Sequence, residues 1–249
     1  MLTALQSFTP TADLLANRVI LITGAANGIG RAIAKGAGAV GATVICLDKD
    51  LKGLESLYDE LVQSNAPEPA LYPLDLAGAT GQHYVELAQT LQKEFGKLDG
   101  LLHNAAFLGA ITPFQQLEFN LWQKVLQTNV NGPMQLTQQL LPLLVKSDSP
   151  RILFTSDTVG RKAKAYWGAY AVSKFAIEGL MQTLAHEYDQ SPKIFICSLD
   201  PGPVHSYFRM QCYPGESAQA RRQPEALVNA YLYLLSTNDI ALQGKALTL

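Results

Sequence analysis

Seven short apolar runs rich in Val, Ile and Leu recur along the chain, and longer stretches with helical periodicity separate each run from the next. This alternation is typical of β–α–β units, in which parallel strands are buried on both faces of a sheet. It predicts an α/β fold with one parallel sheet and helices on both of its faces. The predicted strands are RVILIT, ATVICLD, ALYPLD, LDGLLH, RILFTS, KIFICSL and KALTL.

The stretches between these runs predict helices over residues 29–40, 51–62, 81–95, 114–145, 167–188 and 224–235. Because the seven strands form one alternating series, we expect a single domain over residues 1–249. The segment 201–223 interrupts the series, since it combines Pro, Gly, Tyr, Phe and Met without a clear period and is long for a connection. Long connections often lie over a binding site, so we expect residues 203–223 to form a substrate loop.

Composition argues against several classes of protein. The formal net charge is −2, and the Lys and Arg residues are scattered, so we expect no nucleic-acid partner. No apolar run approaches the roughly 20 residues that a membrane-spanning helix needs, and the first residues lack the pattern of a signal peptide. We therefore expect a cytoplasmic protein without a membrane partner. The three cysteines have no metal-binding spacing and are expected to be buried free thiols, with no metal site: Cys46, Cys197 and Cys212.

A glycine-rich segment, ITGAANGIGRAIA, follows the first predicted strand and runs into a predicted helix. Gly24, Gly28 and Gly30 lack a Cβ, so the backbone can turn sharply and approach a pyrophosphate closely, while the free N–H groups of the helix favour an anion. The spacing G-x-x-x-G-x-G differs from the better-known G-x-G-x-x-G. The segment predicts a dinucleotide site; the alternative is a tight strand-to-helix turn without a ligand.

The second predicted strand ends in CLDKD, where Asp48 stands at the distance from the glycine segment expected for a ribose-binding acid. Its carboxylate would accept hydrogen bonds from both ribose hydroxyls and repel a 2′-phosphate. Asn27 stands where a basic residue would help to bind that phosphate, whereas Lys49 partly offsets the repulsion. We therefore expect NAD to be preferred, with NADP possible. Taken alone, an Asp after a strand is more often a turn former or a helix cap.

Tyr170 and Lys174 are four residues apart within a strongly helical pattern, so they share one face of the helix. A phenol is a weak acid–base group near neutral pH, but a neighbouring cation favours its ionised form and lowers its pKa. Tyr170 could then move a proton to or from a carbinol oxygen. The alternative for such a pair is a solvent-facing tyrosine and lysine with no chemistry.

The order of the motifs resembles that of the short-chain dehydrogenase/reductase family: T-G-x-x-x-G-I-G, N-A-A, Y-x-x-x-K and P-G, over residues 18–249. The segments LLPLLVKSDS, FTSDTVGR and WGAYAVSKFA are similar in particular to a bacterial subgroup of these oxidoreductases. The resemblance implies a Rossmann-type doubly wound sheet of about seven strands and a nicotinamide-dependent reaction that interconverts a carbonyl and an alcohol. It also implies a homodimer or homotetramer, which suits the apolar helical stretches 114–145 and 167–188.

The resemblance further implies roles for individual residues. Asp75 would meet the adenine amino group, Asn129 would hold a water molecule in the proton path, Lys174 would also bind the nicotinamide ribose, and Ser206 would bind the carboxamide. The full set of expected cofactor-binding residues is Gly24, Asn27, Gly28, Ile29, Gly30, Asp48, Asp75, Leu76, Asn104, Ala105, Ala106, Tyr170, Lys174, Pro201, Gly202, Val204 and Ser206.

The chain departs from the family pattern at one catalytic position. The family has a serine thirteen residues before the tyrosine, and here that position is Asp157, with Ser156 and Thr158 one step out of register on either side. Loss of a hydroxyl donor typically removes about 2.7–4 kcal/mol of transition-state stabilisation. An ionised Asp157 would also repel a developing alkoxide and raise the pKa of Tyr170.

Three interpretations of Asp157 remain open from the sequence. In the first, Asp157 is protonated and donates as the serine would. In the second, it binds a substrate amine or guanidinium, while Ser156 or Thr158 reaches the oxygen through a bulge. In the third, the chain binds the cofactor as a regulatory or scaffold protein with impaired catalysis. We expect an enzyme with Tyr170 as general acid/base, assisted by Lys174, Asn129 and an atypical Asp157, because Tyr170, Lys174 and Asn129 are all present.

Overall fold

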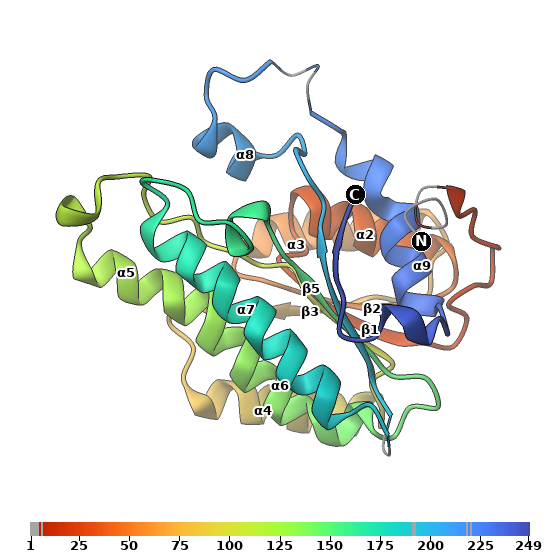
Figure 1. Cartoon of the computed structure of the whole chain (residues 1–249). Helices are drawn as coiled ribbons and strands as arrows, with labels where there is room; N and C mark the ends of the chain where they lie inside the picture. Colours follow the sequence, from red (N-terminus) through yellow and green to blue (C-terminus); the bar gives the residue numbers. More distant parts are fainter. Residues whose placement is uncertain (1–4, 6, 191–192, 218, 220) are drawn as a thin grey trace.

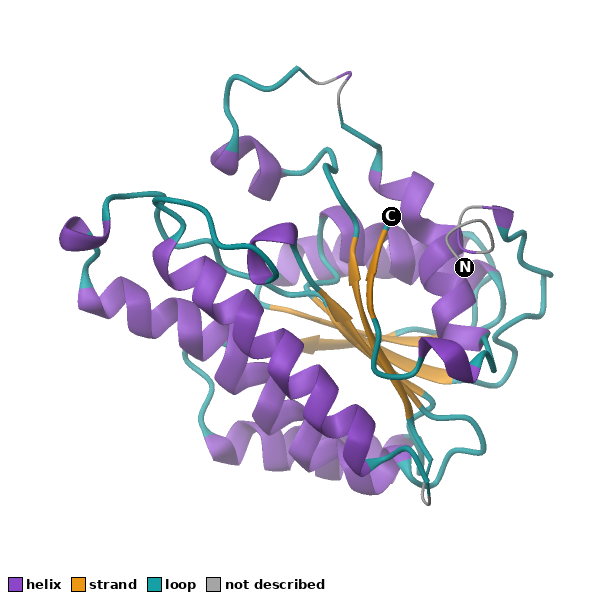
Figure 2. Cartoon of the chain, viewed as in Figure 1, coloured by secondary structure: helices purple, strands orange, loops and turns teal. Residues whose placement is uncertain are grey.

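The structure is a computed structural model that describes residue 5 and residues 7–190, 193–217, 219 and 221–249. Seven parallel strands form one sheet in the order β3-β2-β1-β4-β5-β6-β7. Figures 1 and 2 show this sheet between its covering helices. The strand order reverses between β1 and β4, so a crevice opens there at the carboxyl ends of the strands. All seven predicted strands are confirmed: β1 (Val19–Thr23), β2 (Thr43–Asp48), β3 (Ala70–Pro73), β4 (Gly100–His103), β5 (Arg151–Thr155), β6 (Phe195–Asp200) and β7 (Ala246–Thr248).

Helices cover both faces of the sheet (Figure 2). One hydrophobic core joins the sheet to α2, α3 and α9, and a second joins the other face to α4, α6 and α7. The α-helices of the described residues are α2 (Gly28–Ala39), α3 (Leu51–Gln63), α4 (Gly81–Glu94), α5 (Phe119–Leu126), α6 (Gly132–Leu144), α7 (Gly168–Glu187), α8 (Tyr207–Cys212) and α9 (Val228–Ser236).

The apolar runs form strands because successive side chains enter opposite cores. In β1, Ile20 and Ile22 pack into the first core, whereas Val19 and Leu21 pack into the second. All five residues of this strand are buried, which is the burial pattern of a parallel strand covered on both faces. The doubly wound Rossmann-type fold implied by the family resemblance is therefore confirmed.

The stretch 114–145 is the main difference from the sequence prediction, because it is not one helix. It contains a 3-10 turn (Phe114–Gln116), α5, a π-helical turn (Gln127–Asn131) and α6. Pro133 has no N–H to donate to the carbonyl four residues before it, which is that of Asn129, so regular helical bonding is interrupted at this point. The interruption matters for function, since π-helical turns are frequent at functional sites and this one contains Asn129.

The expected substrate loop contains the short helix α8 and is braced by charge. Arg209 pairs with Glu216 through two hydrogen bonds of 2.8 and 2.6 Å, and the Nε atom of Arg221 lies 3.0 Å from the same carboxylate. Val204 forms an isolated bridge with Arg222, which closes the base of the loop. The described part of the loop is therefore braced by its own side chains.

Three further expectations concern the cysteines, a metal site and a membrane-spanning helix. Cys46, Cys197 and Cys212 are buried free thiols, and burial raises the pKa of Cys46 to about 12 and that of Cys212 to about 11. Within the described residues, no group of three or more His, Cys, Asp and Glu side chains is arranged to hold a metal ion. In the same part of the chain, no helix has the length and apolar character needed to cross a membrane.

Candidate active site

The glycine-rich turn between β1 and α2 is closely packed. Gly24 adopts φ +69°, and a Cβ at this position would lie 2.9 Å from the Cα of Ala105. A Cβ at Gly30 would lie only 2.1 Å from the carbonyl oxygen of Gly24. Gly28 also has a positive φ, +55°. Side chains cannot be accommodated here without moving backbone, so the turn depends on glycine.

The N-terminus of α2 is free to accept an anion. Asn27 is its N-cap residue, yet its side chain makes no capping hydrogen bond and instead donates to Oδ2 of Asp50 at 3.2 Å. The first turn contains no acidic residue, and Ile29 packs against the first core. Exposed N–H groups and a positive dipole end are the features that bind a pyrophosphate. These residues therefore fit the phosphates of a dinucleotide.

A cavity of about 120 Å³ opens beside this turn, at the carboxyl ends of β1 to β4. It brings together six of the expected cofactor-binding residues: Gly24, Asp48, Asp75, Leu76, Ala105 and Ala106. The cavity is also lined by Lys49, Phe107, Lys124 and Thr128. Of these four residues, the sequence analysis predicted an effect on the coenzyme only for Lys49. The cavity lies where the fold class binds the adenosine half of a dinucleotide, so its lining fits that group.

Hydrogen bonds hold in place both Asp48, which lines this cavity, and Asn104, which precedes the lining residue Ala105. Asp48 accepts hydrogen bonds from the backbone N–H groups of Ala26 (3.0 Å) and Asp50 (3.1 Å). Asn104 donates to the carbonyl oxygens of Thr23 (3.2 Å) and Gly24 (3.3 Å), so it joins the ends of β1 and β4. The buried Thr23 hydroxyl accepts from the backbone N–H of Asn104, a role that sequence reasoning missed. A threonine that ends an otherwise apolar strand was the available signal.

The expected catalytic tyrosine contacts Asp157. The Tyr170 hydroxyl, on a side chain that is 4% exposed, donates to Oδ2 of Asp157 at 3.3 Å. Tyr170 lies in the first turn of α7, and Asp157 follows the end of β5 and caps a 3-10 turn (Thr158–Gly160). The other carboxylate oxygen, Oδ1, accepts from the N–H of Val159 at 3.0 Å. Asp157, thirteen residues before Tyr170 in the sequence, therefore stands beside the phenol.

Neither neighbouring hydroxyl is directed at Tyr170. The Ser156 hydroxyl donates to Oε1 of Glu178 at 2.5 Å, and the Thr158 hydroxyl donates to Oδ2 of Asp200 at 2.6 Å. Strand β5 keeps a continuous parallel register with β4 and β6 up to its end. The geometry therefore gives no support to a bulge that would turn either hydroxyl toward the reacting centre.

Burial and charge both affect the catalytic pair. Burial raises the pKa of Tyr170 well above its usual value, and the negative charge of Asp157 raises it further. Burial lowers the pKa of Lys174, and this effect is opposed by nearby carboxylates, Asp157 first among them. Lys174 donates to the carbonyl oxygen of Thr155 at 2.8 Å and lies 5.6 Å from the centre of the Tyr170 ring. Tyr170 is thus a neutral proton donor in this arrangement, and the expected lowering of its pKa by Lys174 stays a prediction.

Asn129 is fixed behind the pair by its π-helical turn. Its side-chain amide donates to the carbonyl of Phe107 (2.9 Å) and to the hydroxyl of Ser173 (3.0 Å), and its oxygen accepts from the N–H of Phe107 (2.7 Å). The Ser173 hydroxyl in turn donates to the backbone carbonyl of Tyr170. Asn129 therefore connects the end of β4 to α7, and its role toward water stays a prediction.

A second cavity, of about 410 Å³, opens between residues 157–164 and the substrate loop. Aromatic side chains lie close to the phenol, since Trp167 and Phe208 have ring centres 5.8 and 5.2 Å from that of Tyr170, and Trp167 also packs 5.7 Å from Tyr213. The residues that line this cavity are Asp157, Thr158, Val159, Lys162, Ala163, Lys164, Asp200, Gly202, Pro203, Arg209 and Tyr213.

The expected nicotinamide-side residues lie on the segment that follows β6. Gly202 adopts φ +67°, and its N–H donates to Oδ1 of Asp200 at 2.9 Å. Pro201 and Val204 are buried, and Ser206 caps α8 by accepting from the N–H of Arg209 at 3.1 Å. Their expected contacts with a nicotinamide stay predictions.

Glu178 is a buried residue that sequence reasoning missed. It lies one helical turn after Lys174 and accepts from the hydroxyls of Ser156 (2.5 Å) and Ser198 (2.7 Å) and from Nε of Arg161 (3.2 Å). Ser156 and Arg161 flank the segment that contains Asp157, so Glu178 anchors that segment to α7 and β6. The signal was an acidic residue on the lysine face of an otherwise apolar helix.

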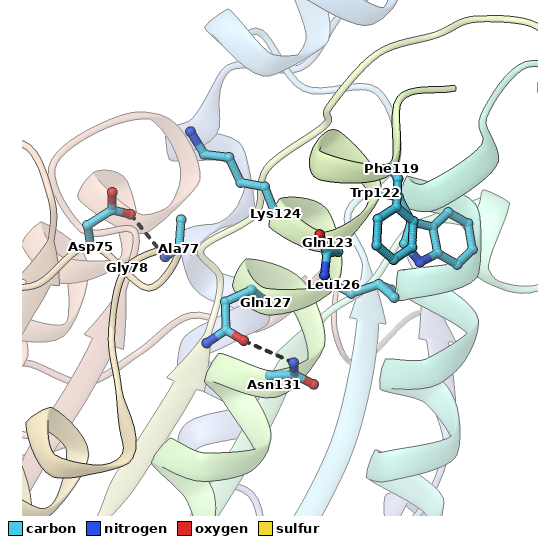
Figure 3. Close-up of a pocket in the computed structure, with 10 residues that line it drawn as sticks. All are labelled: Asp75, Ala77, Gly78, Phe119, Trp122, Gln123, Lys124, Leu126, Gln127 and Asn131. Carbon is cyan, nitrogen blue, oxygen red and sulfur yellow. Dashed lines mark hydrogen bonds between the residues drawn. The ribbon is translucent and has the colours of Figure 1, made fainter. Parts of the chain in front are cut away.

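A larger cavity, of about 770 Å³, lies elsewhere, along α5 (Figure 3). Figure 3 shows Asp75 and Ala77 on one side, Gln127 and Asn131 joined by a hydrogen bond of 3.0 Å, and Phe119 beside Trp122 at the far end. Asp75 is the sole member of the expected site among its lining residues. Because the other expected site residues that line a cavity lie in the 120 Å³ and 410 Å³ cavities, these two cavities form the candidate active site.

Comparison with known proteins agrees with this geometry. Residues 18–217 match the family model for short chain dehydrogenases. The chain is 41% identical over 232 residues to the uncharacterized oxidoreductase YciK of Escherichia coli K12, covering 93% of this chain and 91% of that protein. The solved structure of yciK from E. coli superposes with a TM-score of 0.93 at 39% identity, covering 97% of this chain and 98% of the other.

A structure from Shigella flexneri 2a, complexed with NADP, superposes with a TM-score of 0.92 at 39% identity, covering 96% of this chain and 99% of that chain. These matches bear out the resemblance to the bacterial subgroup that the motifs indicated. The order of the motifs, the doubly wound sheet and the match of the family model agree. The chain belongs to the short-chain dehydrogenase family of oxidoreductases.

Proposed function

We propose that this protein is an NAD(P)(H)-dependent oxidoreductase that interconverts a carbonyl and an alcohol, with Tyr170 as general acid/base. The observation that carries the proposal is the buried Tyr170 hydroxyl, which is hydrogen-bonded to a residue of the 410 Å³ cavity. The nicotinamide would supply or accept the hydride when it is bound. Tyr170, with its raised pKa, would give a proton to a carbonyl oxygen, Lys174 would hold the nicotinamide ribose, and Asn129 would order a water molecule behind them.

The choice between the two coenzymes depends on Asp48. We propose that NAD is preferred, because the Asp48 carboxylate lines the adenosine cavity and would repel a 2′-phosphate. Asp50 follows in the same turn and adds a second carboxylate, with Lys49 between them. Against this preference, the relatives from Shigella flexneri and E. coli CFT073 were solved as complexes with NADP and NADPH. Dissociation constants of the purified protein for NADH and NADPH decide between the two.

The test of the proposed function is oxidation of NADH and NADPH against a panel of aldehydes and ketones, for the wild type and for Tyr170→Phe. The phenylalanine variant keeps the ring packing against Phe208 and loses only the hydroxyl. We expect it to bind the coenzyme and to lose at least about 100-fold in kcat, the usual contribution of a general acid. A Tyr170→Phe variant as active as the wild type would overturn the assignment of Tyr170.

A second function is favoured by one observation. Asp157 occupies the position of the family serine and raises the pKa of Tyr170, which opposes carbonyl chemistry. A regulatory or scaffold protein that binds the nucleotide without efficient turnover would tolerate the raised pKa of Tyr170. It predicts coenzyme binding without oxidation of any substrate by the wild type, together with gain of turnover in Asp157→Ser.

We also propose that the protein acts in the cytoplasm as a homodimer or homotetramer. Apolar side chains that stay exposed on neighbouring helices support self-association: Phe119 on α5, Met134 on α6, and Val172 and Phe175 on α7. Light scattering of the purified protein measures the oligomeric state. A monomer at micromolar concentration would contradict this proposal.

A further inference from the structure

Three carboxylates lie close enough to the Lys174 ammonium group to act on it electrostatically. Asp157, Asp200 and Glu178 all act electrostatically on Lys174, and Asp200 and Glu178 are 4% and 6% exposed. Arg161 pairs with Glu178 at 3.2 Å and so compensates one of the three charges. These five groups together retain an excess of one negative charge. A buried centre with this charge favours a ligand that is positive.

The cations of the outer wall do not cancel this charge. Lys162 and Lys164 are exposed, and Lys164 is held against Tyr213 by a hydrogen bond of 3.1 Å and a cation–π contact of 4.9 Å. Arg209 is paired with Glu216. These three cations line the 410 Å³ cavity, but they are exposed or paired, whereas Asp200, which lines it too, is buried, where the dielectric screening of its charge is weaker.

Asp157 presents an acceptor where the family presents a donor. Its Oδ1 atom is fixed by the N–H of Val159, and its Oδ2 atom faces the Tyr170 hydroxyl at 3.3 Å. The residue also lines the 410 Å³ cavity, so a ligand in that cavity can reach the carboxylate. A carbonyl oxygen has no hydrogen to offer to Oδ2. A protonated nitrogen has one, together with the positive charge that the centre lacks.

We propose that this site also reduces protonated carbon–nitrogen double bonds, in particular those of cyclic imines, and oxidises the corresponding secondary amines. The inference rests on the nicotinamide-dependent hydride transfer proposed above and changes only the group that reacts. Asp157 would accept a hydrogen bond from the iminium N–H and keep the nitrogen protonated, which makes the carbon a better acceptor of a hydride. Asp157 is therefore the specificity-determining residue of the site.

The step balances without a further reactant. The iminium carbon gains a C–H bond with the electron pair that the reduced nicotinamide gives up, the π pair of the double bond becomes the nitrogen lone pair, and the positive charge passes from substrate to coenzyme. The amine then takes a proton from water. The total charge beside Asp157 and Asp200 stays the same throughout the hydride transfer. Reduction of a ketone instead develops negative charge on its oxygen beside these carboxylates until Tyr170 protonates it, which is unfavourable in a buried site.

The experiment compares 1-pyrroline with cyclopentanone, an imine and a ketone of equal ring size, as substrates for coenzyme oxidation. Wild type, Asp157→Ser, Asp157→Asn and the control Asp189→Asn, at an exposed position near the end of α7, are assayed. We expect the wild type to favour 1-pyrroline in kcat/KM and Asp157→Ser to lose at least about tenfold with it. The same variant should gain about 10²- to 10³-fold with cyclopentanone, the contribution of one restored hydroxyl donor. Asp189→Asn should behave as the wild type.

Binding gives a readout that is independent of turnover. Calorimetric titration with pyrrolidinium chloride should show at least tenfold weaker binding to Asp157→Ser than to the wild type. Asp157→Asn keeps an acceptor for the N–H of Val159, so the same titration can be made with this variant if Asp157→Ser does not fold. A wild type that reduces cyclopentanone but not 1-pyrroline, or equal pyrrolidinium affinity in a folded Asp157 variant, would overturn the inference and leave the proposed function intact. If no form oxidises NADH or NADPH with any ketone, aldehyde or imine, the proposed function fails and this inference with it.

Discussion

The Tyr170 hydroxyl donates a 3.3 Å hydrogen bond to Oδ2 of Asp157, so the general acid of the site is joined to a carboxylate. The contact has two consequences. It keeps the phenol protonated, because ionising it would place two negative charges side by side. It also places the Tyr170 partner within electrostatic reach of Lys174, whose ammonium group donates to the carbonyl oxygen of Thr155. The chemistry of the site therefore depends on the charge of Asp157.

Removing that charge should lower the pKa of Tyr170. Burial is the larger cause of the raised pKa and remains in Asp157→Asn, so the phenol should still ionise above its usual range but at lower pH than in the wild type. In the direction of alcohol oxidation, where the phenolate is the base, the rise of kcat with pH should move to lower pH. Ultraviolet titration of the phenolate, with Tyr170→Phe as the blank, measures the shift directly. Identical titration curves for wild type and variant would contradict it.

Asp48 should determine coenzyme affinity. Replacing it by Ser removes the acceptor of the ribose hydroxyls, and a hydrogen bond to a charged group contributes about 1.5–3 kcal/mol, so NADH affinity should fall about 10- to 100-fold. NADPH affinity should stay equal or rise, because the repulsion of the 2′-phosphate is lost. Asp48→Asn, which keeps an acceptor for the N–H groups of Ala26 and Asp50, controls for loss of local structure. Tighter binding of NADPH than of NADH by the wild type would show that Asp48 does not select the coenzyme.

The sequence predicted the sheet and the order of the site because these depend on local patterns. Burial on both faces gives each strand an apolar run such as VILIT, and the turn at Gly24 and Gly30 requires residues without a Cβ. The register from Asp157 to Tyr170 could be counted because strand and helix are adjacent in sequence. Of the six expected residues that line the 120 Å³ cavity, Gly24 and Asp48 follow from the same reasoning, whereas the other four were implied by the family resemblance.

The parts that the sequence did not predict depend on contacts between distant segments. Glu178 looks like an ordinary helical residue until Ser198 and Arg161 are brought to it by β6 and by the turn after β5. The π-helical turn at Asn129 is a different case, because Pro133 was a local signal of the break, but the apolar periodicity continues on both sides of it and hides the extra residue. The bracing of the substrate loop by Glu216 likewise joins residues that share no pattern.

Glu178 should contribute strongly to stability. Glu178→Ala leaves Arg161 half-buried without its partner and two hydroxyls without an acceptor, and breaking a buried pair costs about 3–5 kcal/mol. For a chain of this size the midpoint of thermal unfolding should fall by about 6–20 °C. Glu187→Ala, at an exposed position in the last turn of the same helix, should change it by less than about 2 °C. Scanning calorimetry measures the unfolding midpoints of both variants. Equal midpoints would show that the buried contacts of Glu178 do not stabilise the fold.

Gly30 and Gly179 offer a matched pair of Gly→Ala substitutions. A Cβ at Gly30 would meet the carbonyl oxygen of Gly24 at 2.1 Å, so Gly30→Ala should displace the phosphate-binding turn, cost about 1–3 kcal/mol and abolish coenzyme binding. A Cβ at Gly179 in α7 meets nothing within 4 Å, so Gly179→Ala should stabilise the protein by about 0.5–1 kcal/mol and leave coenzyme binding unchanged. Chemical denaturation and quenching of protein fluorescence by NADH measure both effects. Normal NADH binding by Gly30→Ala would show that the turn tolerates a side chain.

The substrate loop should loosen when the charge on Glu216 is removed. Arg209 and Arg221 lower the pKa of Glu216 to about 2, so the folded loop stabilises the ionised carboxylate. Because this pKa is below that of a free glutamate, the stabilisation is fully present above the free value of about 4.3 and is lost as the pH falls toward 2. Amide hydrogen exchange of residues 203–217 should therefore accelerate in Glu216→Gln at neutral pH, and limited proteolysis should cut the variant loop sooner. Glu225→Gln, at an exposed position after the loop, should leave both unchanged. Equal exchange in wild type and Glu216→Gln would mean that packing of α8, and not the charge network, holds the loop over the site.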